Sequence, residues 1–260
     1  MGWNIALEQY ATAQRAAGRA KGTIRLHRHY LTGLAEVVTA PWRATAVELL
    51  EFMGREEWQP ETRKSARSSV RGFYRWGHGM GYVEHDPSDR LPSVTVPASV
   101  ARPTPEHLVK VLAARSDRLG FMAMLAAYCG LRAGEIARLH SSWLVGDSLV
   151  IPGKGGKERA VPVVHRGLLV RLRKVEGWAF PNGQGSHLSP GHVSRLLSEA
   201  MPEDWTAHTL RHRCASTAYA GTRDMFAVQE LLGHSRPETT RRYVRLPDDA
   251  VRAAVAAASA

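Results

Sequence analysis

The second half of the sequence carries residue types that together could perform chemistry on a phosphate group. They are two arginines, a lysine, two histidines and a tyrosine: Arg132, Lys154, His208, Arg211, His234 and Tyr243. Guanidinium and ammonium groups neutralise phosphate oxygens, histidine exchanges protons near neutral pH, and a tyrosine hydroxyl can act as a nucleophile. The residues lie far apart in the chain, so joint chemistry depends on the fold that brings them together.

The local setting of four of these residues favours side chains that reach outward. Arg132 follows a predicted helix break, while Lys154 and Lys157 lie in a glycine-rich segment between two predicted strands. His208 and Arg211 are three residues apart, so a helix would bring them to one face. Each also has a structural explanation, as a surface arginine, a hairpin turn or part of a solvated helix face.

The histidines and the tyrosine have similar alternatives. His208 and His212 have the i, i+4 spacing of a zinc-protease helix, but Thr209 stands where that motif requires glutamate. This disfavours a metal site, and we expect His212 to be structural. His234 follows a glycine and could interact with a helix dipole, and Tyr243 taken alone could be a half-buried aromatic residue.

Taken together and in this order, five short motifs resemble those of the tyrosine recombinases, the phage integrase family. The motifs are Gly130-Leu131-Arg132 with Glu135, Gly153-Lys154-Gly155 with Arg159-Ala160-Val161-Pro162, His208-x-Leu210-Arg211-His212, Leu231-Leu232-Gly233-His234-Ser235 and Thr239-Thr240-Arg241-Arg242-Tyr243. They span residues 130–243. The helical beginning of the chain, with Thr23-Ile24 and Phe73-Tyr74-Arg75-Trp76, also looks like the core-binding domain of that family.

The resemblance implies that Tyr243 attacks a scissile phosphate and leaves a 3′-phosphotyrosyl bond and a free 5′-hydroxyl. Such an attack builds negative charge on the non-bridging oxygens, which Arg132 and Arg211 would neutralise. Lys154 would act as the general acid for the leaving 5′-oxygen, with Lys157 as the second choice. The implied activity is that of a site-specific DNA recombinase or integrase of phage or mobile-element type.

The remaining roles follow from the same resemblance. His208 is the candidate for assisting deprotonation of Tyr243, since a free tyrosine has a pKa of about 10. His234 would hydrogen-bond the phosphate, and Glu135 would orient the arginines or a neighbouring histidine. Because many cations surround one phosphate and the sequence has no carboxylate cluster, we expect a metal- and ATP-independent reaction that uses no cofactor.

The fold class that the patterns predict is mostly α with a small β-hairpin or sheet. Helices are expected from Trp3, Lys21, Thr45 and Pro60, giving a four- to five-helix first domain. The second domain is expected to be a mixed α/β catalytic domain of the tyrosine recombinase type. Its predicted strands are 148–152 and 159–164, and its predicted helices are 105–116, 119–129, one from Gly134, 166–174, 190–200, 208–220, 224–232 and 237–243.

Five prolines between Pro87 and Pro105 predict an extended linker. The predicted domains are therefore a helical core-DNA-binding domain (1–90), a linker (91–105), a catalytic domain (106–246) and a C-terminal tail (247–260). The helix that begins at Pro60 carries a basic stripe that could face phosphates, although such a stripe is often just a solvated face. Its members are Arg63, Lys64, Arg67, Arg71 and Arg75.

Composition narrows the class of partner. The formal net charge is +11, and most of it lies beyond residue 100, where 22 Lys and Arg face 14 Asp and Glu. Such an excess favours a polyanion, and double-stranded DNA is the expected partner. Cys129 and Cys214 are predicted to be small buried residues. No secretion signal or membrane span is apparent, so we expect a protein of the bacterial cytoplasm, associated with the nucleoid.

Several alternatives stay open at this stage. A type IB topoisomerase-like or resolvase activity would use the same chemistry, and a catalytically silent DNA-binding regulator would keep the fold. The resemblance implies a homotetramer on DNA and a simple recombinase without an arm-binding domain, and a directionality factor is left open as a further partner. The tail to Ala260 could be a docking helix or, by its small apolar end, a degradation tag. The target sequence and the outcome, whether integration, excision, inversion or dimer resolution, are not predicted.

Overall fold

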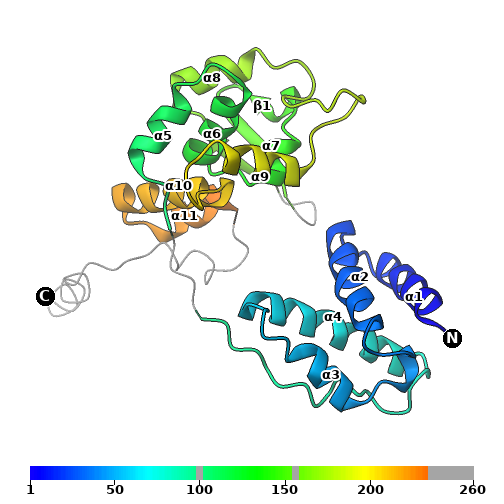
Figure 1. Ribbon diagram of the computed structural model, residues 1–260. Helices are drawn as coiled ribbons and strands as arrows, with labels where there is room; N and C mark the ends of the chain where they lie inside the picture. Colours follow the sequence, from blue (N-terminus) through cyan, green and yellow to red (C-terminus); the bar gives the residue numbers. More distant parts are fainter. Residues whose placement is uncertain (98–101, 154–157, 234–260) are drawn as a thin grey trace, which may run out of the picture. The chain divides into compact units, whose positions relative to one another are not determined.

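The computed structural model describes residues 1–97, 102–153 and 158–233 (Figure 1). The chain divides into two compact units, Met1–Ala98 and Ser99–Ala260. The division falls within the segment expected to be a linker, but both ends of that segment are packed. Leu91 belongs to the core of the first unit, and Thr104 donates a 2.9 Å hydrogen bond from its hydroxyl to that of Thr209 in the second.

The described part of the first unit is helical. Its α-helices are α1 (Trp3–Ala16), α2 (Lys21–Ala35), α3 (Ala46–Met53) and α4 (Pro60–Gly79), with a 3-10 turn at Pro41–Arg43. Thr45 and Glu48 cap α3 reciprocally, and Pro60 begins α4 where its missing N–H has no cost. Helix α2 packs against both α1 and α4.

Aromatic side chains form much of this unit's core. Phe73 of α4 stacks on Trp3 and Trp42, with ring centroids 5.5 and 5.0 Å apart. A Cβ at Gly77 would lie 2.5 Å from the Trp42 ring, so the absence of a side chain at Gly77 lets the indole lie directly against α4.

The second unit is organised around helix α6 (Arg118–Cys129), which is buried on nearly all sides, as its apolar sequence predicts. Helices α5 (Glu106–Ala113) and α10 (Ala207–Thr222) pack closely against it. The other described helices are α7 (Ala133–Ala137), the 3-10 turn Ser141–Trp143, α8 (Arg166–Arg173), α9 (Pro190–Glu199) and α11 (Met225–Leu232).

A small antiparallel sheet lies beside these helices (Figure 1). It is formed by β1 (Leu144–Val145), β2 (Ser148–Pro152) and β3 (Glu158–Pro162) in the order β1-β2-β3. In the β2–β3 pair Leu149 faces Val161, and both are buried in the main core. The strand β1 was not predicted, and the second predicted strand ends at Pro162 rather than at residue 164.

The predicted fold class, mostly α with a small sheet, is confirmed. The helix predicted near 105–116 is shorter and ends at Ala113, and the one predicted from Gly134 is the single short turn α7. The predicted helix 237–243 and the tail 247–260 lie outside the described residues. Within the described ranges, no helix is long and apolar enough to cross a membrane.

Candidate active site

Arg132 lies at the N-cap of α7, directly after the break between α6 and α7. Gly130 ends α6 in the left-handed conformation with φ of +63°, and Leu131 is fully buried. The Arg132 backbone is extended, and its N–H donates a 2.8 Å hydrogen bond to Oε2 of Glu135. The Arg132 side chain is 44% exposed, so its guanidinium can reach solvent as the sequence predicts.

Three arginines surround the carboxylate of Glu135. Arg132 donates from Nη1 to Oε1 at 2.9 Å, and Arg159 of β3 donates from Nη1 and Nη2 to the two oxygens, each at 2.8 Å. Nη1 of Arg211 lies 3.9 Å from Oε2. Burial raises the pKa of Glu135, but the hydrogen bonds and charges of Arg159 and Arg132 outweigh it and hold the pKa at about 2. Glu135 is therefore anionic at neutral pH and fixes the arginines around it.

Arg211 is almost completely buried on α10. Its Nη1 donates to the carbonyl of Gly130, and its Nη2 donates to the carbonyl of Leu232 at 2.7 Å. These carbonyls lie at the C-terminal ends of α6 and α11, where a helix dipole favours positive charge. The structure thus brings Arg211 to the same cluster as Arg132, as a buried member of it.

His208 lies in the first turn of α10 and is exposed, while His212 one turn later is buried. Their ring centroids are 4.1 Å apart. Nδ1 of His212 accepts a 3.2 Å hydrogen bond from the backbone N–H of Arg102, which agrees with the structural role predicted for this histidine. Among the described residues, no three His, Cys, Asp or Glu side chains come together as a metal site.

Four predicted residues, Lys154, Lys157, His234 and Tyr243, lie outside the described residues. The described chain nevertheless fixes where two of these segments begin. Pro152 pairs with Glu158, so the strands that flank the lysine segment are in register. The carbonyl of Gly233 accepts a 3.1 Å hydrogen bond from Nη2 of Arg132, one residue before His234.

A hollow of about 900 Å³ opens beside this cluster, between α7, the base of the β2–β3 hairpin and α11. Its walls include Arg132, Glu135, Arg159, Phe226 and Gly233. Phe226 is 75% exposed, which is unusual for an aromatic residue on a helix face. The exposed part of Arg132 therefore faces a space large enough for a bound group.

The predicted basic stripe on α4 divides into two sets. Arg63 and Arg67 donate to the carbonyls of Arg55 and Leu91 at 2.6 and 2.8 Å, and Arg71 pairs with Asp89 at 3.1 Å. These three arginines thus fasten neighbouring segments to α4. The other two, Lys64 and Arg75, are exposed.

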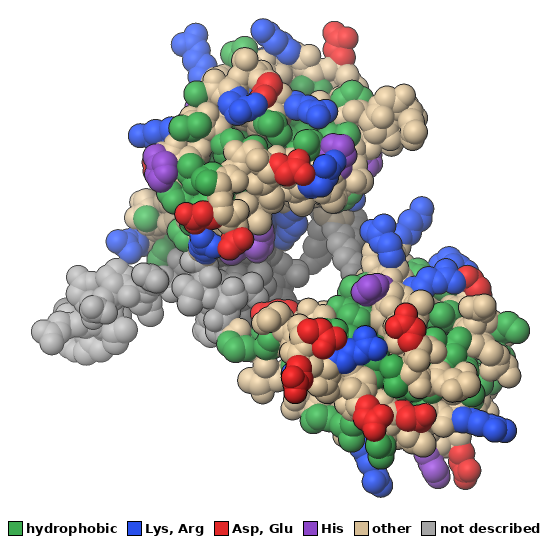
Figure 2. Space-filling view, viewed as in Figure 1, with side chains coloured by type: hydrophobic (Ala, Val, Ile, Leu, Met, Phe, Trp, Pro, Cys, Tyr) green, Lys and Arg blue, Asp and Glu red, His purple; other side chains and the backbone are tan. Residues whose placement is uncertain are grey.

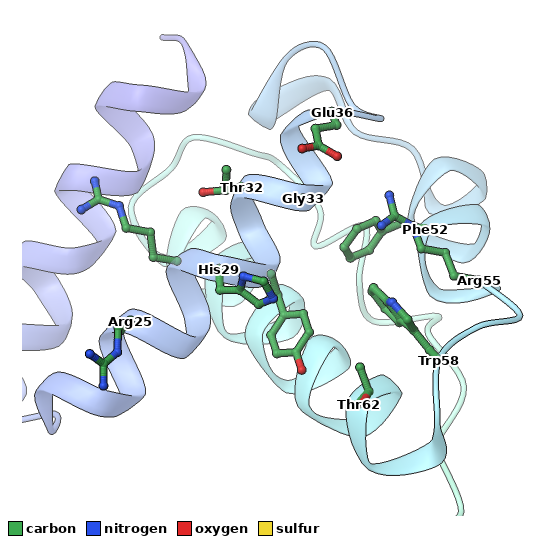
Figure 3. Close-up of a pocket in the computed structure, with 11 residues that line it drawn as sticks. Arg25, His29, Thr32, Gly33, Glu36, Phe52, Arg55, Trp58 and Thr62 are labelled. Carbon is green, nitrogen blue, oxygen red and sulfur yellow. The ribbon is translucent and has the colours of Figure 1, made fainter. Parts of the chain in front are cut away.

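Another hollow with basic side chains lies in the first unit and was not predicted (Figure 3). It has a volume of about 550 Å³ and lies between α2, the end of α3 and the start of α4. The guanidinium of Arg55 lies over the rings of Phe52 and Trp58, at 4.7 and 5.4 Å from their centroids. Arg25 and His29 of α2 line the same hollow (Figure 3). Their i, i+4 spacing on a predicted helix was the available sequence signal.

No role was predicted for Arg159, which stands in the motif that follows Lys154 and Lys157. Its side chain is only 7% exposed and is the main partner of Glu135. In the view of Figure 2, basic side chains are exposed on both units, beside acidic and apolar ones. The Glu135 cluster itself, with three arginines around one carboxylate, concentrates positive charge within the described residues.

Comparison with known proteins places this geometry in a family. Residues 104–249 match the phage integrase family. The chain is 31% identical to the tyrosine recombinase XerD of Caulobacter vibrioides over 224 residues, which cover 75% of this chain and 73% of that protein. It is 30% identical to the tyrosine recombinase XerC of Pseudomonas putida, with 80% and 78% covered.

Solved structures show the same fold. A lambda integrase (75-356) dimer bound to a COC' core site superposes with a TM-score of 0.76 at 19% identity and covers 95% of this chain and 98% of that one. The XerH site-specific recombinase bound to a difH substrate gives a TM-score of 0.65 at 20% identity, with 96% and 83% covered. The chain therefore belongs to the phage integrase family of tyrosine recombinases, which carry out site-specific DNA recombination.

Proposed function

We propose that this chain cleaves and rejoins DNA strands through a covalent 3′-phosphotyrosyl intermediate on Tyr243. The observation that carries the proposal is the convergence of Arg132 and Arg211 on one buried carboxylate, Glu135, with Arg132 facing an open hollow. The exposed guanidinium of Arg132 is suited to neutralise the charge that develops on a non-bridging oxygen of an attacked phosphate, and we propose that Arg211 adds positive charge from its buried position.

The proposed roles of the other residues complete the reaction. Lys154 protonates the leaving 5′-oxygen, with Lys157 as the alternative acid, and His208 assists deprotonation of the tyrosine. His234 hydrogen-bonds the phosphate. Energy of the cleaved bond is kept in the phosphotyrosyl link, so religation needs no ATP. The arginines stabilise the charge that a metal ion would otherwise neutralise, so we propose metal independence as well.

We also propose that residues 1–90 form a core-DNA-binding domain joined by the linker 91–105 to a catalytic domain, 106–246. Lys64 and Arg75 are exposed on α4 and are suited to contact phosphates, as are Arg25 and Arg55 at the hollow of Figure 3. Arg63, Arg67 and Arg71 support this surface through their contacts to residues 55, 91 and 89.

The proposed assembly is a homotetramer on two double-stranded DNA sites in the bacterial cytoplasm, at the nucleoid. A lambda integrase tetramer bound to a Holliday junction, which shares the fold with a TM-score of 0.73, supports this proposal. The outcome that we propose is integration and excision of a phage or mobile element, aided by a directionality factor. The Xer relatives support dimer resolution as the alternative. Plasmids that carry two sites in direct or inverted orientation distinguish these outcomes by their products.

The chemistry can be tested with nicked DNA. Duplexes enriched from a random pool by binding to the full chain are nicked at successive positions, so that the fragment released by cleavage diffuses away and the covalent adduct accumulates. The wild type should form an adduct on a denaturing gel in EDTA and without ATP, and Tyr243→Phe should form none.

Three results would contradict parts of this proposal. An adduct formed by Tyr243→Phe at the wild-type level would show that the nucleophile is another residue. A requirement for Mg²⁺ would exclude the metal-independent mechanism. Specific binding by the wild type without any adduct would favour the alternative of a DNA-binding regulator that kept the fold.

A further inference from the structure

Arg159 joins three elements of the cluster from a buried position. It lies at the beginning of β3, and its guanidinium makes a two-pronged ion pair with Glu135 of α7, with both N–O distances 2.8 Å and both side chains 7% exposed. Its Nε donates to the carbonyl of Leu231 in α11 at 3.1 Å. A planar guanidinium can satisfy this arrangement, whereas a lysine ammonium cannot form the paired bonds.

The end of α11 is built around the same side chain. Gly233 has a φ of +61°, and a Cβ there would lie 2.8 Å from Cδ of Arg159 and 3.0 Å from its Nη1. The turn therefore passes directly over the arginine. Both the positive φ and the short distance to the Arg159 side chain favour glycine here. The carbonyl of this same Gly233 accepts the hydrogen bond from Nη2 of Arg132.

Arg132 is thus held on two sides by groups that both contact Arg159. Its Nη1 binds Glu135, whose two oxygens are fixed by Arg159, and its Nη2 binds Gly233, whose backbone packs on Arg159. Removing Arg159 would loosen both supports of the Arg132 guanidinium, while leaving the residue itself in place.

Arg159 also sets the charge available at the site. Arg132, Arg159, Arg211 and Glu135 together carry a formal charge of +2, which would fall to +1 without Arg159. Glu135 would then be compensated mainly by Arg132, whose guanidinium would be drawn toward the carboxylate and away from the hollow. The positive charge that remains for a phosphate in the hollow would be smaller.

We propose that Arg159 is a positioning residue for strand cleavage, which holds the Arg132 guanidinium toward the scissile phosphate and keeps Glu135 from neutralising it. The proposal rests on the proposed function of Arg132 and names a residue that acts on DNA through it. The hydrogen-bonding groups of Arg159 are engaged by Glu135 and the carbonyl of Leu231, so in this proposal it acts through Arg132.

The test compares two scissile groups in single-turnover adduct formation on the nicked site. One is the natural phosphodiester, and in the other a methyl group replaces a charged non-bridging oxygen, so that less negative charge develops on cleavage. Relative to the wild type, Arg159→Met should lose roughly 10²-fold in rate on the phosphodiester. Its loss should be at least about tenfold smaller on the methylphosphonate, because less charge depends on Arg132 there. Arg132→Gln should show the same selectivity.

Two further variants make the result decisive. Arg159→Lys keeps the charge but not the paired bonds, so it should recover part of the phosphodiester rate and remain selectively impaired. It also serves if Arg159→Met does not fold. Arg173→Met, at an exposed arginine paired with Asp147, is the matched control and should cleave both substrates at the wild-type rate.

Equal losses on both substrates in the folded Arg159 variants would overturn the proposal, because a general structural role would slow both reactions alike. Wild-type rates in Arg159→Met would overturn it as well. Failure of the proposed function is distinguishable, since in that case the wild type forms no Tyr243-dependent adduct or Arg132→Gln cleaves normally.

Discussion

Replacing Glu135 by glutamine removes the charge on which the arginine cluster depends and leaves Arg159 buried without an anion. The pKa of Glu135 is held at about 2, against an ordinary value of 4.5, by Arg159 and Arg132 despite the opposing effect of burial. At about 1.4 kcal/mol per pKa unit, this difference corresponds to roughly 3 kcal/mol of stability at neutral pH. Removing one partner of a buried ion pair lowers the free energy of unfolding by a similar amount, about 3–5 kcal/mol.

The sign of the pH dependence follows from the lowered pKa. As the pH falls, the unfolded chain binds a proton at this site before the folded chain does. The contribution of Glu135 is therefore complete above about pH 5 and declines as the pH falls from about 4.5 toward 2. Glu135→Gln lacks this contribution at every pH. The difference in free energy of unfolding between wild type and variant should therefore shrink as the pH falls.

The assay is urea unfolding from pH 7 to pH 3, followed by hydrogen exchange in peptides from α7 and β3, which report on the second unit. At pH 7, Glu135→Gln should lower the free energy of unfolding of this unit by roughly 3 kcal/mol. Glu199→Gln, at an exposed carboxylate paired with Arg195, is the control and should change stability by less than about 1 kcal/mol. The reasoning would be refuted if Glu135→Gln had the same urea midpoint as the wild type at pH 7, or if the difference in free energy of unfolding stayed constant from pH 7 to pH 3.

Three other predictions concern the supports of the site. Gly130→Ala should destabilise the second unit by about 2–4 kcal/mol in urea unfolding, because its φ is +63° and its Cβ would lie 2.8 Å from the side chain of Leu232. Asp224→Ala should cost about 1 kcal/mol in the same measurement, since its carboxylate caps the first turn of α11. Burial raises the pKa values of Cys129 and Cys214 to about 12 and 11, so neither should react with iodoacetamide at pH 8 until the protein unfolds; rapid labelling of the native protein would contradict this.

Much of the fold was predictable because its signals are local. Pro60 begins α4, an almost continuous apolar run gives the buried α6, and alternating residues give β2 and β3. The short strand β1 was missed because two residues cannot show an alternating pattern. Helix α7, predicted from Gly134, begins at Ala133 after the N-cap Arg132 and ends after one turn at Ala137.

The motifs predicted that Arg132, Arg211 and Glu135 belong together, but not the contacts that hold them. Arg132 and Arg211 were chosen from motifs, and the structure brings both to Glu135. The part played by Arg159 depends on contacts to residues 24 and 72 positions away, which no spacing rule on one sequence can indicate. The same reason explains why the contacts of Arg67 and Arg71 with residues 91 and 89 were not foreseen.

Under the proposed mechanism, the contacts of Arg211 tie DNA cleavage to the completion of folding. Its guanidinium bridges the carbonyls of Gly130, the C-cap of α6, and Leu232, the last residue of α11, so the arginine acquires its native arrangement only when α11 packs against α10. A nascent or partly unfolded chain in which α11 is detached has every proposed catalytic side chain in its sequence but no formed arginine cluster. Under the proposed mechanism, such a chain would still attract DNA by its charge but would not cleave a strand that it could not reseal.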